Sequence, residues 1–595
     1  MIMKAVIFSA AAAGALLAGL GSFSAFQSTP AEPAFLEPRL LAAGLCGSDN
    51  TLEKRRAFFL EMGRAYAQEA AFSTENTSLP EQTLSAFALD ITTSDPQAQY
   101  WFNIGLSHLA NFNHGEAEEA FQRAQAFDPV CAMCFWGEAF ALGSNINAPF
   151  NAEQGKKARA ALNAALDRRT DITPLEDALI QALNVRYYEI PGGEVREEAE
   201  AFAAAMESLA SEFPDSDFAL ALAAEANMDT QPWDYWEKAG LTAKGRTAKT
   251  IDLLETVLAR NPDYAPAIHL YIHITEASND PYRAERFADR LSAQQLRLGH
   301  LIHMPSHTYY RIGRWEKSLL ANIDAVAVDE AYLEAGDASD VYRYGYYPHN
   351  VHFTLTTAMM AGKRDTARDM AKKLEAALPL AGDKPEPRAE WIAASNYQSA
   401  LQFLSTDDII ALPEPDDAHP FLKASWHYSQ GQARALMGDF EAASGHAAAL
   451  EALASTSEIA AYEAAFIPAP DILQIAGLTV RARIAAEGGD LKMAIQLMEQ
   501  AVIVQDGISY TEPPFWYYPA RQTLAAYALR DGQHDRARAL FYETLVESPN
   551  NAYALYGLSK TFEAMKDDRS ADYAMSLFED AWLGDADTTP DLERL

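Results

Sequence analysis

The stretch Ala98–Pro129, AQYWFNIGLSHLANFNHGEAEEAFQRAQAFDP, carries the pattern that decides the fold. Its apolar residues recur every three or four positions, which predicts amphipathic helices rather than strands. Pro129 stands where the second helix has to end, because proline cannot continue a helix. Similar runs rich in Ala, Leu, Glu and Arg dominate the rest of the chain, and strand signals are nearly absent. The stretch therefore predicts one helical hairpin in a chain built of such hairpins.

This hairpin resembles the tetratricopeptide repeat (TPR) family, whose unit is a pair of antiparallel helices. Residues of the hairpin stand where the family places Trp, Gly, Ala, Phe, Ala and Pro, namely Trp101, Gly105, Ala117, Phe121, Ala124 and Pro129. Weaker units follow in phase, marked by Trp426, Ala433 and Ala442, by Ala494, Met498 and Ala501, and by Ala537, Phe541 and Pro549. The resemblance covers most of residues 96–580 and implies an all-α, TPR-type α-solenoid, a right-handed superhelix of helical hairpins.

The N-terminus has the layout of a secretory signal, with Lys4, the apolar run Ala5–Leu20 and small residues up to Ala25. We expect residues 1–25 to be a signal peptide and the mature protein to be periplasmic or secreted, without stable membrane insertion. An uncleaved anchor helix is the alternative reading. Residues 26–95 are then an N-terminal segment with a capping helix at 52–72. Residues 96–410 form a solenoid with a histidine-rich face, and residues 411–595 form further repeats.

Composition narrows the class of partner. The chain has 595 residues, is 49% hydrophobic and has a formal net charge of −36. Such acidity argues against a nucleic-acid partner, which needs a basic face. Three cysteines are too few for a disulfide-built fold. In an oxidising compartment Cys131 and Cys134 are candidates for a disulfide or a soft metal site, and two buried thiols are the plainer alternative.

Histidines are concentrated in one part of the predicted solenoid. Seven of the thirteen in the chain lie between residues 269 and 352: His269, His273, His300, His303, His307, His349 and His352. The pair His269 and His273 is repeated 34 residues later by His303 and His307, and 34 residues is the TPR period. The cluster therefore predicts a site shared by successive equivalent helices.

Repeat starts at Ala265, Gly299 and Pro348 place these histidines in register, the third unit following an insertion of about fifteen residues. All three units have a histidine at the fifth position of the first helix, the second and third units have one at the second position, and the first and second units have one at the ninth. These positions share one helical face. The twelfth positions are Glu276, Tyr310 and Met359. The resemblance implies that this face lines the concave groove, where the family holds its ligands.

Imidazoles four residues apart on a helix converge readily on one metal ion, and neighbouring helices lie close enough to add a third ligand. Six or seven imidazoles are enough for two ions. Nitrogen ligation of this kind suits Cu, Zn, Fe or Ni and does not suit Mg or Ca, so the expected cofactor is Cu, Zn or Fe. A hydrogen-bonded floor of the groove and a pH-sensitive or substrate-binding histidine cluster are the alternatives.

Three functions compete on this evidence. A secreted metalloenzyme would use Glu276 as a ligand or general base and Tyr310 as a proton or hydrogen-bond donor. The segment 342–348, YRYGYYP, would serve as a lid over the groove. A binding module would instead hold a metal, peptide, protein or small molecule in the groove, and an interaction scaffold would do neither. The chain contains no HExxH motif, nucleophile elbow, phosphate loop or dinucleotide fingerprint.

Overall fold

The computed structural model describes residues 81–595 except 192, 238–239, 337, 379, 381–385, 586–588, 593 and 595. The chain divides into two compact units, Met1–Ala65 and Tyr66–Leu595, and all described residues belong to the second. The predicted signal peptide and the capping helix at 52–72 lie outside the described residues. Within them, no helix combines the length and the apolar character needed to cross a membrane.

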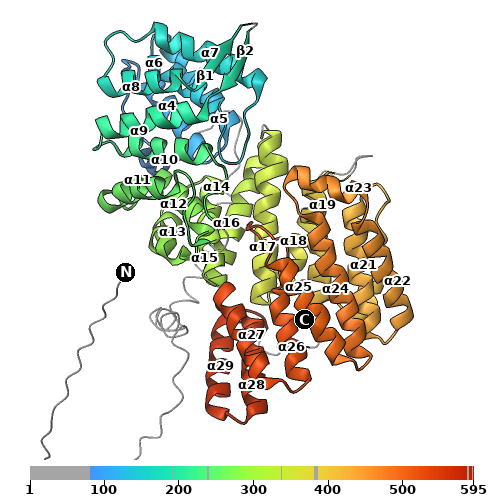
Figure 1. The fold of residues 1–595 in the computed structure, drawn as a ribbon. Coiled ribbons are helices and arrows are strands. Elements are labelled where there is room, and N and C mark those ends of the chain that lie inside the picture. The colour runs from blue at the N-terminus through green and yellow to red at the C-terminus, as the bar shows by residue number, and fades with distance from the viewer. Residues whose placement is uncertain are drawn as a thin grey trace, which may run out of the picture. The chain divides into compact units, whose positions relative to one another are not determined.

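The first half of the described chain is almost entirely helical (Figure 1). In chain order its α-helices are α3 (Glu81–Ala86), α4 (Pro96–Ala110), α5 (His114–Phe127), α6 (Ala132–Ala141), α7 (Ala152–Asp167), α8 (Pro174–Asn184), α9 (Ala199–Glu212), α10 (Asp217–Asp229), α11 (Thr247–Arg260), α12 (Ala265–Glu276), α13 (Glu285–Ala293), α14 (Gly299–His303), α15 (Pro305–Arg311) and α16 (Trp315–Glu334). A short 3-10 helix, η2 (Pro281–Ala284), precedes α13.

The second half continues in the same way. Its elements are the π-helical turn η3 (Tyr342–Tyr346), α17 (Tyr347–Ala361), α18 (Arg364–Ala377), α19 (Pro387–Phe403), α20 (Thr406–Ile410), α21 (Pro420–Leu436), α22 (Phe440–Ala454), α23 (Ser457–Ala460), the 3-10 helix η4 (Ala461–Ala465), α24 (Ala469–Glu487), α25 (Leu491–Gln505), α26 (Ala520–Arg530), α27 (His534–Glu547), α28 (Ala552–Met565) and α29 (Asp568–Ala581).

Consecutive helices pack in pairs along the chain, such as α4 with α5, α21 with α22, α24 with α25 and α28 with α29 (Figure 1). Close approach within a pair depends on small residues. A Cβ atom added to Gly105 would lie 2.5 Å from the ring of Phe121, and one added to Gly137 would lie 2.4 Å from it. Gly557 is held against Phe541 in the same way. The pairing confirms the all-α, TPR-type α-solenoid and the roles predicted for Gly105 and Phe121.

Two features depart from a run of plain hairpins. The strands β1 (Tyr187–Ile190) and β2 (Glu194–Glu197) form an antiparallel hairpin after α8. The first helix predicted to start at Gly299 is divided into α14 and α15 at Met304, because Pro305 lacks the N–H group that an unbroken helix needs. This break matters for the site, since it lies between His303 and His307.

The interior consists of two large apolar clusters. The first extends from Phe87 to Tyr346 and the second from Leu319 to Tyr527. Cys131 and Cys134 lie in the first cluster and form a disulfide at the start of α6. Of the three readings that the sequence leaves open, the structure shows the disulfide, and a disulfide leaves no thiolate to bind a soft metal. The histidine-rich helices α12, α14, α15 and α17 lie where the two clusters meet.

Candidate metal centre

Six of the seven clustered histidines form two groups of three. The first group consists of His269, His273 and His300, and the second consists of His303, His307 and His349. Within each group, one ring nitrogen of every histidine lies within 4.8 Å of the corresponding nitrogens of the other two. All are buried except His349, which is partly buried. The two groups adjoin, since the ring centroids of His273 and His307 are 5.5 Å apart.

The groups follow a rule of repeat positions. Each combines the fifth and ninth positions of one first helix with the second position of the next first helix. Side chains four residues apart lie one above the other on a helix, and the start of the neighbouring helix supplies the third imidazole. The third unit does not continue the rule, because its ninth position is Thr356. His352, its fifth position, therefore has no histidine four residues later on its own helix to complete a group.

In the second group, the Nε2 atoms of the three rings face one another. The Nε2 atom of His303 is 2.8 Å from Nε2 of His307 and 3.1 Å from Nε2 of His349. Such separations are slightly shorter than the ~3.3 Å between ligands of a tetrahedral ion with bonds of about 2.0 Å. On the other side of the rings, Nδ1 of His303 faces Asn322 Oδ1 at 2.6 Å, and Nδ1 of His307 faces Glu276 Oε2 at 2.6 Å. Metal-bound histidines use their second nitrogen in this way, which fixes the ring and its tautomer.

The first group is arranged similarly. The Nε2 atoms of His269 and His300 are 3.1 Å apart, and a ring nitrogen of His269 is hydrogen-bonded to the backbone of Ala110. The Nδ1 atom of His273 faces Glu276 Oε1 at 3.0 Å. Its Nε2 atom is buried and has no hydrogen-bond partner among the described residues, and the same holds for Nδ1 of His300. Unsatisfied buried nitrogens beside other imidazoles are what a site for an ion requires.

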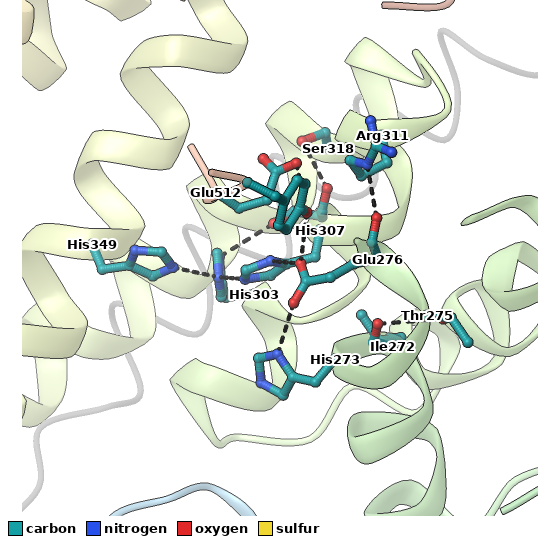
Figure 2. A network of polar contacts seen from close by, with 12 residues as sticks. Ile272, His273, Thr275, Glu276, His303, His307, Arg311, Ser318, His349 and Glu512 are labelled. Atoms are coloured by element: carbon teal, nitrogen blue, oxygen red, sulfur yellow. Dashed lines mark hydrogen bonds and ion pairs between the residues drawn. The ribbon is translucent and has the colours of Figure 1, made fainter. Parts of the chain in front are cut away.

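Glu276 connects the two groups, as Figure 2 shows. One carboxylate oxygen accepts from His273 of the first group and the other accepts from His307 of the second. Burial alone would raise the pKa of Glu276, but the two imidazoles outweigh burial and lower its pKa to about 2. With both oxygens engaged and the charge held, Glu276 is placed to orient the rings. It is not placed to act as a free general base.

The charge state of five of the six imidazoles suits metal binding, and His307 is the exception. Burial, reinforced by the neighbouring imidazoles, lowers the pKa of His269, His300, His303 and His349 well below the usual value. These rings are therefore neutral at physiological pH, and neutral imidazole is the form that binds metal. Burial would lower the pKa of His307 too, but the Glu276 carboxylate outweighs burial and raises it.

A phenylalanine with an unusual backbone conformation closes one side of the first group. Phe112 lies in the turn between α4 and α5 with φ of 54°, the left-handed region that disfavours bulky residues. Its ring centroid lies 4.5 Å from that of His269 and 5.4 Å from that of His300. Glycine occupies the same turn position in five other hairpins, at Gly313, Gly362, Gly438, Gly489 and Gly532. Lys566 stands at this position in another hairpin with an exposed side chain, whereas the ring of Phe112 is buried against the imidazoles.

Segments distant in the sequence complete the surroundings of the cluster, and the histidine spacing does not point to them. Tyr510, in the loop between α25 and α26, donates its hydroxyl to Glu512 Oε1 at 2.9 Å, and the same hydroxyl lies 3.3 Å from Glu276 Oε2. Burial raises the pKa of Glu512 to about 8, against the opposing charge of Arg311. Arg311 donates to the backbone oxygen of Glu276 at 2.8 Å (Figure 2). Together with Phe112 these residues enclose a face that had been expected to line an open groove.

Two of the predicted site residues lie apart from the cluster. The imidazole of His352 is hydrogen-bonded to the hydroxyl of Tyr517 and lies against Trp391, so the structure does not bring it to either group. The ring of Tyr310 packs edge-on against Trp315 and Phe353. Phe353 lies between it and the second group, with its ring centroid 5.0 Å from those of His303 and His307. Tyr310 thus lies one layer of side chains behind the imidazoles.

The segment predicted as a lid lies beside the first group. Tyr346 of η3 has its ring centroid 4.8 Å from that of His300, and Asn147 donates to its hydroxyl at 3.4 Å. Tyr342, from the same segment, is anchored to Asp329 at 2.5 Å. The segment therefore covers part of the cluster in this structure. The positive charge of the exposed Arg388 adds to burial and to the neighbouring imidazoles in lowering the pKa of His349, the least buried of the six.

Comparison with known proteins adds little. No protein-family model matches the chain, and no curated protein matches it in sequence. Solved structures with a similar course include the human IFIT1 dimer with m7Gppp-AAAA, at 12% identity and a TM-score of 0.29 over 85% of this chain and 96% of that one. Yeast Tom70 is also similar, at 12% identity and a TM-score of 0.27 over 83% and 93%. At such scores these structures carry no argument about function, and the assignment of the fold rests on the helix pairing above.

Proposed function

We propose that this protein binds two transition-metal ions, one in each group of three histidines, and uses them as a metal-dependent enzyme. The observation that carries the proposal is the orientation of the rings around Glu276. Its carboxylate holds the Nδ1 atoms of His273 and His307, one from each group. The opposite nitrogens of these rings are thereby turned into the two groups, where ions would be held.

The donor set favours copper first and zinc second. All six donors are imidazole nitrogens, which suit copper and zinc and do not suit magnesium or calcium. Iron in oxygenases of the open-site kind takes two histidines and one carboxylate, and here the nearest carboxylate, Glu276, is occupied by two imidazoles. Copper also has the highest affinity of the common divalent ions for a given nitrogen site.

An enzyme is favoured over a purely structural role because of ligand number. Structural zinc sites are closed by four protein ligands, whereas sites with three leave a position for water or substrate. Each group here supplies three histidines. Ions held in this way supply Lewis acidity or, with copper, electron transfer. The chain's own contribution is to fix the rings through Glu276 and Asn322 and to exclude water with Phe112 and Tyr346.

We place this activity outside the cytoplasm. The secretory layout of residues 1–25 supports this, and so does the Cys131–Cys134 disulfide, since disulfides persist in oxidising compartments. The substrate or partner is a small molecule rather than a nucleic acid, given the net charge of −36 and the enclosed position of the histidines.

Metal content of single-histidine variants tests the proposal. The untagged protein, stripped and then reconstituted with Cu(II) or Zn(II), is expected to retain two ions per chain, one for each histidine group. His269→Ala and His303→Ala are each expected to retain one, and the double variant is expected to retain almost none. His352→Ala is the matched control, because His352 is equally buried on the same face but belongs to neither group.

The metal contents of these proteins distinguish ions bound by the two histidine groups from ions bound elsewhere and from no metal at all. A wild-type protein that stays metal-free after reconstitution with both ions would overturn the proposal and leave a solenoid that binds a ligand without metal. Equal loss of metal in His352→Ala and in the two group variants, with all of them folded by circular dichroism, would show that the ions are bound elsewhere.

A further inference from the structure

A partly open cavity lies against the first histidine group. It has a volume of about 50 Å³ and lies between α4, α6, α10 and α12. That volume holds a few water molecules, and because the cavity is partly open, a small organic molecule can enter and extend beyond it. His269 and Phe112 are part of its wall, so the cavity and the first group share residues.

Most of the cavity wall is aromatic or aliphatic. The aromatic residues that line it are Phe87, Phe112, Trp136, Phe140, Phe218 and Tyr264. Empty cavities in proteins are apolar as a rule and take up apolar ligands, whereas sites for ordered water need several polar partners. Mostly apolar walls with a small number of polar groups are also the usual composition of small-molecule sites. The wall therefore favours an apolar ligand over water.

One carboxyl group stands out in this wall. Glu225 of α10 lines the cavity and is partly exposed. Within the described part of the chain its carboxyl oxygens have no hydrogen-bond partner. The nearby Arg186 is engaged instead with Glu197 at 2.6 Å and Asp229 at 3.4 Å. The Glu225 carboxyl group is therefore available to form a hydrogen bond with a molecule that enters the cavity.

We propose that this cavity is the substrate pocket of the metal centre and takes a small, neutral, mostly apolar molecule with one hydroxyl or amine group directed at Glu225. The other end of the molecule then lies toward Phe112 and His269, beside the first group. The inference rests on the proposed function for its link to metal, but the binding of such a molecule in the cavity is measurable without metal.

The charge of Glu225 supports a neutral ligand. Burial raises the pKa of Glu225 to about 7, although the charge of Arg186 opposes this. Below that pH the carboxyl group is protonated and both donates and accepts a hydrogen bond. A hydroxyl group complements it in both roles. An anionic group would face the same carboxyl once it ionises, and would have to lose its water among aromatic rings.

A matched pair of probes tests the pocket in the metal-free protein. 4-Fluorophenol and fluorobenzene differ only in the hydroxyl group, and their binding is measured by fluorine NMR at pH 6. The wild type is expected to bind 4-fluorophenol about fivefold more tightly than fluorobenzene, the effect of one net hydrogen bond. Glu225→Leu is expected to abolish this preference, whereas Glu225→Gln, which keeps a hydrogen-bonding group, is expected to retain it. Ala221→Leu, which adds volume at the wall, is expected to weaken both probes.

Adding Cu(II) tests whether the cavity lies beside the ion bound by the first histidine group. Bound 4-fluorophenol is expected to be broadened by the paramagnetic ion in the wild type and not in His269→Ala. Equal binding of the two probes, or a preference that survives Glu225→Leu, would overturn the pocket. Probe binding with the expected preference but no uptake of Cu(II) would overturn the proposed function and leave the pocket standing.

Discussion

Replacement of Glu276 by glutamine tests the link between the two histidine groups. In the wild type each carboxylate oxygen accepts from one imidazole, His273 Nδ1 at 3.0 Å and His307 Nδ1 at 2.6 Å. A glutamine side chain has one oxygen and one NH₂ group. It can therefore accept from only one of the two rings, and its NH₂ group meets the N–H of the other. Glu276→Gln is expected to release one ring and to remove the charge that polarises both.

The size of the effect follows from these contacts. A hydrogen bond to a charged group contributes about 1.5–3 kcal/mol, so the loss of one corresponds to roughly a tenfold to hundredfold loss of metal affinity. Loss of the residue that orients a metal-bound histidine has the same effect, about 10–100-fold. The weaker affinity is expected mainly in the group whose ring is released. The other group keeps its hydrogen bond but loses the charge.

A chelator-competition titration with Cu(II) or Zn(II) measures both affinities. Glu390→Gln is the matched control, because Glu390 is also buried and faces an imidazole, His419 Nδ1 at 3.1 Å, outside the cluster. The control variant is expected to bind metal like the wild type. If folded Glu276→Gln also bound two ions with wild-type affinity, the reasoning about the bridging carboxylate would be refuted.

Further predictions concern stability, pH and the cysteines. Phe112→Gly relieves about 1 kcal/mol of backbone strain but loses a buried ring that contributes about 3–5 kcal/mol. Denaturant unfolding should therefore show a lower free energy of unfolding than in the wild type. Lys566→Gly, at the same turn position with an exposed side chain, should leave the free energy of unfolding unchanged or raise it. Burial raises the pKa of Asp329 to about 7, above its unfolded value near 4, so the folded state holds the extra proton between these values and stability falls as pH rises from about 4 to 7. Asp329→Asn should flatten this part of the stability profile, and a slope that persists would contradict the assignment. Cys131→Ser/Cys134→Ser should leave metal content unchanged, and a lost ion would restore the soft-metal reading.

Much of the architecture was accessible from the sequence. The small and large residues of the hairpin at residues 98–129 predicted how its helices meet, and Gly105 does contact the ring of Phe121. The 34-residue offset placed His269 and His303 at equivalent positions. It did not show which histidines share a group, because that depends on how the start of one helix faces the middle of the preceding one. For this reason His352, although in register, was grouped with rings that it does not approach.

The residues that surround the cluster were less accessible. Asn322 lies on the second helix of its hairpin, and nothing in the histidine spacing pointed to it. Tyr510 reaches Glu276 across 234 residues of sequence, a contact that only the packing of distant hairpins creates. Phe112 did leave a signal, since it stands in a turn where other hairpins have glycine. A residue that breaks a local backbone rule is a useful marker of a site.

The central claim is that two ions are bound by two sets of three histidines. Anomalous diffraction from crystals of the copper-loaded protein tests it most directly. We expect two peaks, one about 2.0–2.1 Å from nitrogens of His269, His273 and His300, and one at the same distance from nitrogens of His303, His307 and His349. A map with no peak at either group, or with copper held only at residues outside these six, would contradict it.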